Sequence, residues 1–118
     1  MGFRRWLARL TESDESRLDV EIRSWAESIP GSVRIGDAKP REKVKIAGVI
    51  RRLTVLPMQD NESLEVVISD GTGEVSIQFM GRRAIRGLTL GTRVVVEGVI
   101  GEQHGRVQMM NPRLELTI

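Results

Sequence analysis

The chain has 118 residues, a formal net charge of +2 and no cysteine. This length suits one domain with a core of its own, and a composition of 40% hydrophobic and 29% charged residues argues against wholesale disorder. The absence of cysteine excludes disulfides, thiolate metal ligands and thiol nucleophiles.

The positive charge is small, and arginine carries most of it. Of the 18 basic residues only Lys39, Lys43 and Lys45 are lysines. The planar guanidinium group suits bidentate contacts to phosphate. The charge is therefore compatible with a polyanionic partner, although it is far below that of a histone-like protein.

No apolar run approaches the roughly 20 residues that a membrane-spanning helix needs; one of the longest is Ala47–Ile50. The N-terminus also lacks the apolar segment and small-residue cleavage site of a signal peptide. We therefore expect a cytoplasmic protein.

Up to position 29 the apolar residues recur at helical spacing, which predicts two amphipathic helices. The first stripe comprises Phe3, Trp6, Leu7 and Leu10, and the second comprises Leu18, Ile22, Trp25, Ala26 and Ile29. Pro30-Gly31 is expected to end the second helix. Residues 32–42 then read as a connecting arm, so we expect a helical extension and linker over 1–42 and a second domain over 43–118.

From residue 43 the apolar period changes to two, which is typical of strands. The alternation predicts five strands, over residues 44–56, 64–69, 75–79, 93–100 and 106–110. Gly48 and Gly98 interrupt this alternation, which suits a bulge or a bend where one strand serves two sheets. The pattern predicts an all-β fold, a closed five-stranded Greek-key barrel preceded by the helical segment. One helical turn is expected at 82–86.

Four segments within residues 44–116 resemble the OB-fold, the oligonucleotide/oligosaccharide-binding barrel. They are residues 44–50, 66–73, 91–99 and 105–112. The Asp70–Gly73 turn and the Met110–Pro112 ending are similar to OB domains of the tRNA anticodon-binding type and to the wedge domain of a bacterial branched-DNA helicase. The whole chain also resembles a small stand-alone actinobacterial OB-fold family, through its basic N-terminal helix, its acidic linker and the segment Gly81–Gly87.

This resemblance implies a nucleic-acid surface on the second and third strands and on the loops after the first and fourth. The candidate binding residues are Lys45, Arg51, Arg52, Gln78, Arg82, Arg83, Arg86, His104 and Arg106. A solvated barrel surface explains any single one of them better than nucleic-acid binding does. Only Arg82–Arg86, with three arginines in five residues, forms a dense focus of charge.

OB domains bind single strands through basic residues and also through stacking of bases on aromatic side chains, and each stacked base contributes about 1–3 kcal/mol. The four aromatic residues, Phe3, Trp6, Trp25 and Phe79, all fall on apolar faces, where core packing explains them. We therefore expect weak, salt-sensitive binding through phosphate contacts. Asp60, Glu62 and Glu65 would weaken it further if they border the groove.

Catalysis has little support, because no nucleophile arrangement, phosphate-binding loop or metal motif occurs. His104 is the only histidine, and no second imidazole or thiol is available to complete a metal site. We expect no enzyme activity, no cofactor and no metal.

Two functions remain in competition. The first is weak, largely sequence-independent binding of single-stranded or branched DNA or RNA. The alternative is a protein-interaction adaptor that uses the barrel and the N-terminal helices without binding nucleic acid. A membrane-surface role for residues 3–10 is disfavoured, because a helix of about two turns is a marginal anchor.

Overall fold

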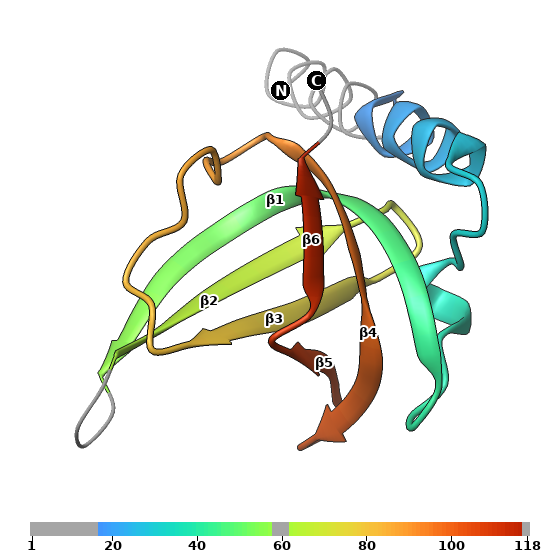
Figure 1. Ribbon diagram of the computed structural model, residues 1–118. Helices are drawn as coiled ribbons and strands as arrows, with labels where there is room; N and C mark the ends of the chain where they lie inside the picture. The colour runs from blue at the N-terminus through green and yellow to red at the C-terminus, as the bar shows by residue number, and fades with distance from the viewer. Residues whose placement is uncertain (1–16, 58–61, 117–118) are drawn as a thin grey trace, which may run out of the picture.

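The computed structural model describes residues 17–57 and 62–116 (Figure 1). The expected helix at 3–10 lies outside this part of the chain. Within it, no helix is long and apolar enough to cross a membrane.

The strands close into a barrel, as predicted. They are β1 (Lys43–Pro57), β2 (Glu62–Ser69), β3 (Glu74–Met80), β4 (Arg93–Gln103), β5 (Arg106–Met110) and β6 (Arg113–Leu116). Neighbours follow the order β1-β2-β3-β5-β4, and β4 also pairs with β1, which closes a ring of five strands. β3 and β5 run parallel, whereas the other pairs are antiparallel. The prediction of an all-β, five-stranded barrel after a helical segment is confirmed.

β6 was not predicted. It follows Asn111-Pro112, which ends β5, and it pairs with Val94–Glu97 of β4, while β5 pairs with Ile100–Gln103 of the same strand. Gly98 lies between these two pairings, and a Cβ there would be 2.9 Å from the Met109 sulfur. Because Gly98 has no Cβ, Met109 of β5 and the following Pro112 can lie close to β4, which then pairs with β5 on one side of Gly98 and with β6 on the other.

β1 bends at Gly48, so that one strand serves two neighbours. Residues 43–49 pair with β4, and residues 49–57 pair with β2. A Cβ at Gly48 would lie 2.9 Å from the carbonyl oxygen of Ser69, so only glycine permits this close approach. Of the two roles predicted for Gly48 the structure shows the bend, since the bulge lies further on, between Ile50 and Arg52.

The barrel interior is filled by alternate side chains of every strand. The largest fully buried ones are Ile46, Ile50, Ile68, Ile77, Ile100 and Met109. Phe79 also belongs to this core, with 7% of its surface exposed, so the prediction that it packs inward is confirmed.

Helical residues 17–28 lie against the outer side of the barrel (Figure 1). Ala26 packs against Ala47 of β1 and Val95 of β4, with Trp25 and Ile29 beside them. The predicted apolar stripe is confirmed for these residues and for Ile22, but Leu18 is 52% exposed.

The expected connecting arm is more ordered than the sequence suggested. It contains the 3-10 helix η1 (Ile35–Asp37) and a bridge from Ser32 to Lys45. Ile35 is 3% exposed and belongs to the barrel core. The division of the chain at residues 42/43 stays a prediction.

The prediction of a helical turn at 82–86 is wrong: the segment is irregular, with a bend at Arg83 and a turn that begins at Arg86. Gly81 and Gly87 flank it with φ values of +72° and +91°, the left-handed region that ends a helix. Leu88 closes one turn by donating its N–H to the Ile85 carbonyl oxygen, and its side chain enters the core.

Candidate nucleic-acid interface

Polar side chains line a continuous groove on the outer face of β2, β3 and β5. One hollow is lined by Arg52, Glu65, Val67, Glu74, Ser76, Gly105, Arg106 and Val107. The next is lined by Glu65, Ser76, Gln78, Gln103, His104, Arg106 and Gln108. Both hollows share Glu65, Ser76 and Arg106, so they form one surface. A third joins it at Arg52 and Glu74 and reaches Arg51 and Asp19. We call these three hollows together the groove.

Strand register explains why these side chains face the same way. Arg52 lies opposite Val67, Glu65 opposite Gln78, and Ser76 beside Gln108. The extra residue between Ile50 and Arg52 shifts the alternation of β1, so that Arg51 and Arg52 are both exposed while Leu53 packs against the core. The bulge therefore delivers two consecutive arginines to one end of the groove.

The charges of the groove are balanced. Arg51, Arg52 and Arg106 face Asp19, Glu65 and Glu74 across the three hollows. Three carboxylates were expected to weaken nucleic-acid binding if they border the groove. Glu65 does line two of the hollows, whereas Glu62 pairs with Arg83 and Asp60 lies outside the described residues. The net attraction of the groove for a polyanion is consequently small.

The two arginines at the bulge are held loosely. Arg51 Nη2 lies 3.6 Å from Asp19 Oδ1, and Arg52 Nη2 lies 3.8 Å from Glu74 Oε2. These distances exceed those of charge-assisted hydrogen bonds, which are about 2.7–2.9 Å. In the part of the chain that the structure describes, neither guanidinium makes a hydrogen bond, so their donors are available to an incoming phosphate.

The structure brings only some of the predicted residues together. Arg51, Arg52, Gln78, His104 and Arg106 line the groove. His104, with a φ of +53°, lies in the turn between β4 and β5.

The other four predicted residues lie elsewhere. Lys45 is on the half of β1 that pairs with β4, opposite Glu97. Arg82 lines a separate hollow with Phe79 and Leu114, and Arg83 Nε lies 3.2 Å from Glu62 Oε2. Arg86 is exposed in the 81–92 segment. This segment contributes no lining residue to the groove.

No aromatic side chain lines the groove among the described residues. Phe79 is buried, and Trp25 lies on the helix with the Arg93 guanidinium 5.1 Å from its ring centroid. The largest exposed apolar side chains near this face are Met80, 39% exposed, and Met110, 47% exposed and paired with Gln78. The predicted lack of a stacking platform is thus visible in the described part of the groove.

Several groove residues were missed by sequence reasoning. Ser76 and Gln108 share the outward parity of Gln78, so alternation alone contained the signal for them. Asp19 carried no such signal, because only the docking of the helix brings it to Arg51.

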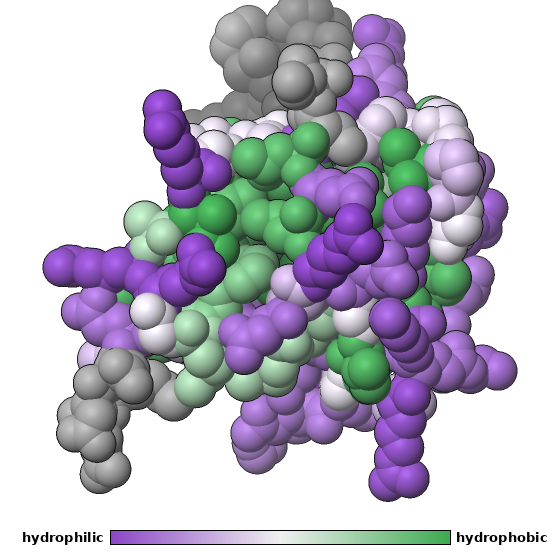
Figure 2. Space-filling view, viewed as in Figure 1, coloured by the Kyte–Doolittle hydropathy of each residue, from purple (hydrophilic) through white to green (hydrophobic). Residues whose placement is uncertain are grey.

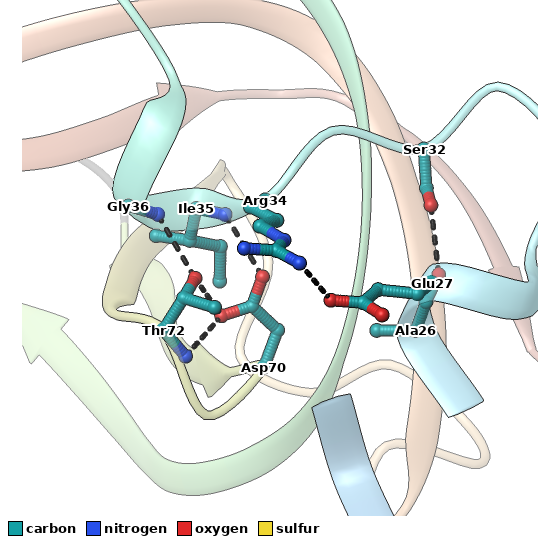
Figure 3. A network of polar contacts seen from close by, with 8 residues as sticks. All are labelled: Ala26, Glu27, Ser32, Arg34, Ile35, Gly36, Asp70 and Thr72. Atoms are coloured by element: carbon teal, nitrogen blue, oxygen red, sulfur yellow. Dashed lines mark hydrogen bonds and ion pairs between the residues drawn. The ribbon is translucent and has the colours of Figure 1, made fainter. Parts of the chain in front are cut away.

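Asp70 holds the arm that follows this helix (Figure 3). Its buried carboxylate accepts hydrogen bonds from the Ile35 N–H at 2.8 Å and from the Thr72 N–H at 2.8 Å. It also accepts the Thr72 hydroxyl at 2.6 Å and the Gly73 N–H at 3.2 Å. The turn predicted only as a hairpin connection therefore also anchors the N-terminal segment beside the groove.

No group of three or more potential metal ligands occurs among the described residues. The chemistry that the groove offers is hydrogen bonding and charge, from the guanidinium groups of Arg51, Arg52 and Arg106 and from the carboxamides of Gln78, Gln103 and Gln108. Such groups bind phosphate and the edges of bases.

Residues 44–117 match the sequence model of a family described as OB-fold nucleic acid binding domain, of the tRNA anticodon type. The chain belongs to this family. Its OB-fold domain thus contains all of β1 to β6 except Lys43, while the helix and the arm lie outside the match.

Solved structures with the same fold include RecG and Replication Protein A. RecG bound to a three-way DNA junction superposes with a TM-score of 0.63 and 22% identity, covering 72% of this chain and 12% of the RecG chain. A chain of a Replication Protein A heterotrimer bound to ssDNA gives a TM-score of 0.53 and 14% identity, covering 84% of this chain and 77% of that one. At these identities the likeness shows the OB-fold alone. A search of curated protein sequences finds no match.

Proposed function

We propose that this OB-fold domain binds single-stranded or branched nucleic acid along the groove, weakly and with little sequence preference. The observation that carries the proposal is a row of adjoining hollows in which Arg52 and Arg106 line one hollow and Arg106 lines the next with glutamine side chains. Membership of a nucleic-acid-binding family supports it, as do neighbours described as bound to a DNA junction and to ssDNA.

Binding would proceed by exchange of counter-ions. A backbone phosphate replaces the loosely held Asp19 and Glu74 as partner of Arg51 and Arg52, and Arg106 holds a second phosphate further along. The carboxamides can donate to or accept from base edges, but each base offers them a partner, so discrimination is low. We propose binding and not catalysis as the role of this surface.

The test is fluorescence anisotropy with labelled single-stranded DNA, RNA, duplex DNA and a branched junction at low salt. We expect single strands or the junction to bind more tightly than duplex. In the variant Arg52→Ala with Arg106→Ala, affinity should fall by about tenfold, because two phosphate contacts are lost.

The matched control is Arg82→Ala with Arg86→Ala, which removes the same charge outside the groove. We expect a smaller loss of affinity in this variant. Absence of binding at low salt, or an equal loss in the two variants, would contradict binding in the groove.

A further inference from the structure

The positive charge that the groove lacks is found at one end of the barrel. In the 81–92 segment Arg82, Arg83 and Arg86 are exposed, and Glu62 is the carboxylate that pairs with one of them. Among the described residues neither Arg82 nor Arg86 has an acidic partner within ion-pair distance. Among the described residues, the pairing of Arg83 with Glu62 thus leaves the charges of Arg82 and Arg86 unbalanced.

A hollow lined by both polar and apolar side chains lies beside these arginines. It has a volume of about 330 Å³ and is lined by Phe79, Arg82, Ile85, Asn111, Pro112 and Leu114. Figure 2 shows hydrophobic side chains gathered on this face, between the 81–92 segment and β6, with strongly hydrophilic side chains beside them. Ile85 and Leu114 pack against the barrel core and remain partly exposed, so the hollow opens onto the core. We call this hollow the mouth.

An open strand edge borders the mouth. β6, which carries Leu114, pairs with β4 along one side. In residues 17–57 and 62–116 no other strand pairs with β6 and no backbone hydrogen bond reaches its second side. Unpaired N–H and C=O groups of this kind accept an added strand from another polypeptide.

We propose that the mouth is a docking surface for an acidic, apolar peptide segment of a partner protein. Large aliphatic side chains of the segment enter the hollow over Ile85 and Leu114, and its carboxylates pair with Arg82 and Arg86. Its main chain extends the sheet along β6. This surface shares no lining residue with the groove, so the inference does not depend on nucleic-acid binding.

A peptide fits the mouth better than a nucleic acid does. Nucleic acid would use the arginines, but it needs aromatic faces for stacking, and the aromatic ring that lines the mouth, Phe79, is 7% exposed. Nucleic acid also has no main-chain amides with which to pair an open strand edge. The aliphatic floor and the β6 edge are both complementary to polypeptide.

The experiment titrates the full chain with a labelled short peptide of alternating leucine and glutamate. The matched peptide controls are one in which serine replaces leucine and one of residues 1–16 of this chain. We expect the leucine-glutamate peptide to bind, and Arg82→Ala with Arg86→Ala to weaken it about tenfold, as two exposed ion pairs are lost. The groove variant Arg52→Ala with Arg106→Ala should bind this peptide unchanged.

Amide signals in NMR spectra locate the bound peptide. We expect shifts over residues 81–92 and 113–116, and none at Ser76 or Gln108 of the groove. Ile85→Ser should abolish binding of the peptide. Because Ile85 packs against the core, a thermal melt of this variant shows whether it is still folded. If it unfolds, the variant Arg82→Ala with Arg86→Ala still tests the proposal, since both arginines are exposed.

The proposal is overturned if the serine peptide binds equally, since charge alone would then suffice. It is also overturned if the shifts lie in the groove, or if an oligonucleotide displaces the peptide from the mouth. Equal binding of the peptide of residues 1–16, or a doubling of mass with concentration in sedimentation, would assign the mouth to this chain itself.

Discussion

Glu65 lines two adjoining hollows of the groove, close to Arg106 and Gln78. Its carboxylate repels any backbone phosphate that crosses this face. We expect Glu65→Gln to raise the affinity for single strands about two- to fivefold at low salt, and less at high salt. Fluorescence anisotropy measures the change.

The control for this variant is Glu97→Gln, which removes the same charge on β4, where Glu97 pairs with Lys43. A general effect of net charge would raise the affinity equally in both variants. That result would place the nucleic acid outside the groove.

Asp70 is a second residue whose role the structure makes specific. Replacing it by alanine removes the acceptor of four hydrogen bonds and leaves the Ile35 N–H without its partner. We expect the free energy of unfolding to fall by about 2–4 kcal/mol. Urea denaturation followed by circular dichroism measures this.

Asp37→Ala serves as the matched variant, because Asp37 is an exposed carboxylate in the same region. A loss of about 0.5 kcal/mol or less is expected there. If Asp70→Ala is as stable as Asp37→Ala, the turn does not anchor the N-terminal segment.

At the scale of elements, the bend of β1 rests on Gly48. Gly48→Ala would place a Cβ 2.9 Å from the Ser69 oxygen and 3.2 Å from its carbonyl carbon, both in the backbone of β2. The strands would have to separate, so we expect a loss of about 1–3 kcal/mol in the free energy of unfolding.

The control is Gly101→Ala, which also replaces a strand glycine by alanine but at a position with room for a Cβ. The nearest atom to a Cβ at Gly101 is 3.7 Å away, an ordinary van der Waals contact. The urea midpoint of this variant should stay close to that of the unchanged chain. Equal destabilisation of the two variants would mean that steric contact with β2 is not the reason for glycine at position 48.

Elements differed in how far the sequence predicted them. The alternation of β1 to β5 identified the strands, because a strand buried on one face repeats every two residues. The sequence did not predict the conformation of 81–92 or the presence of strand β6, each for its own reason. In 81–92 a helical turn was expected because small Greek-key barrels commonly carry a cap between the third and fourth strands, but residues 82–86 are irregular. β6 is only four residues long and exists through its pairing with β4.

For the whole molecule, the distribution of charge decides the expected behaviour with salt. The groove offers three arginines, each with a carboxylate nearby. We expect the logarithm of the association constant for single strands to fall with the logarithm of salt concentration with a slope of about −2. Anisotropy titrations at a series of salt concentrations give the slope; a value near −5 would mean that the 81–92 arginines also contact the nucleic acid.

The sequence by itself determined the barrel, the burial of Phe79 and the modest charge, because hydrophobic periodicity and composition are local properties of the chain. It also contained the parity that places Gln78, Ser76 and Gln108 on one face. Only the tertiary structure decided which charges meet. Docking of the helix on the barrel brings Asp19 to Arg51. The bulge in β1 turns Arg52 outward, and the arginines of the 81–92 segment lie apart from the groove. Such contacts join residues distant in the chain, and no periodicity encodes them. The balanced charge of the groove and the exposed arginines beside the mouth are therefore properties of the fold.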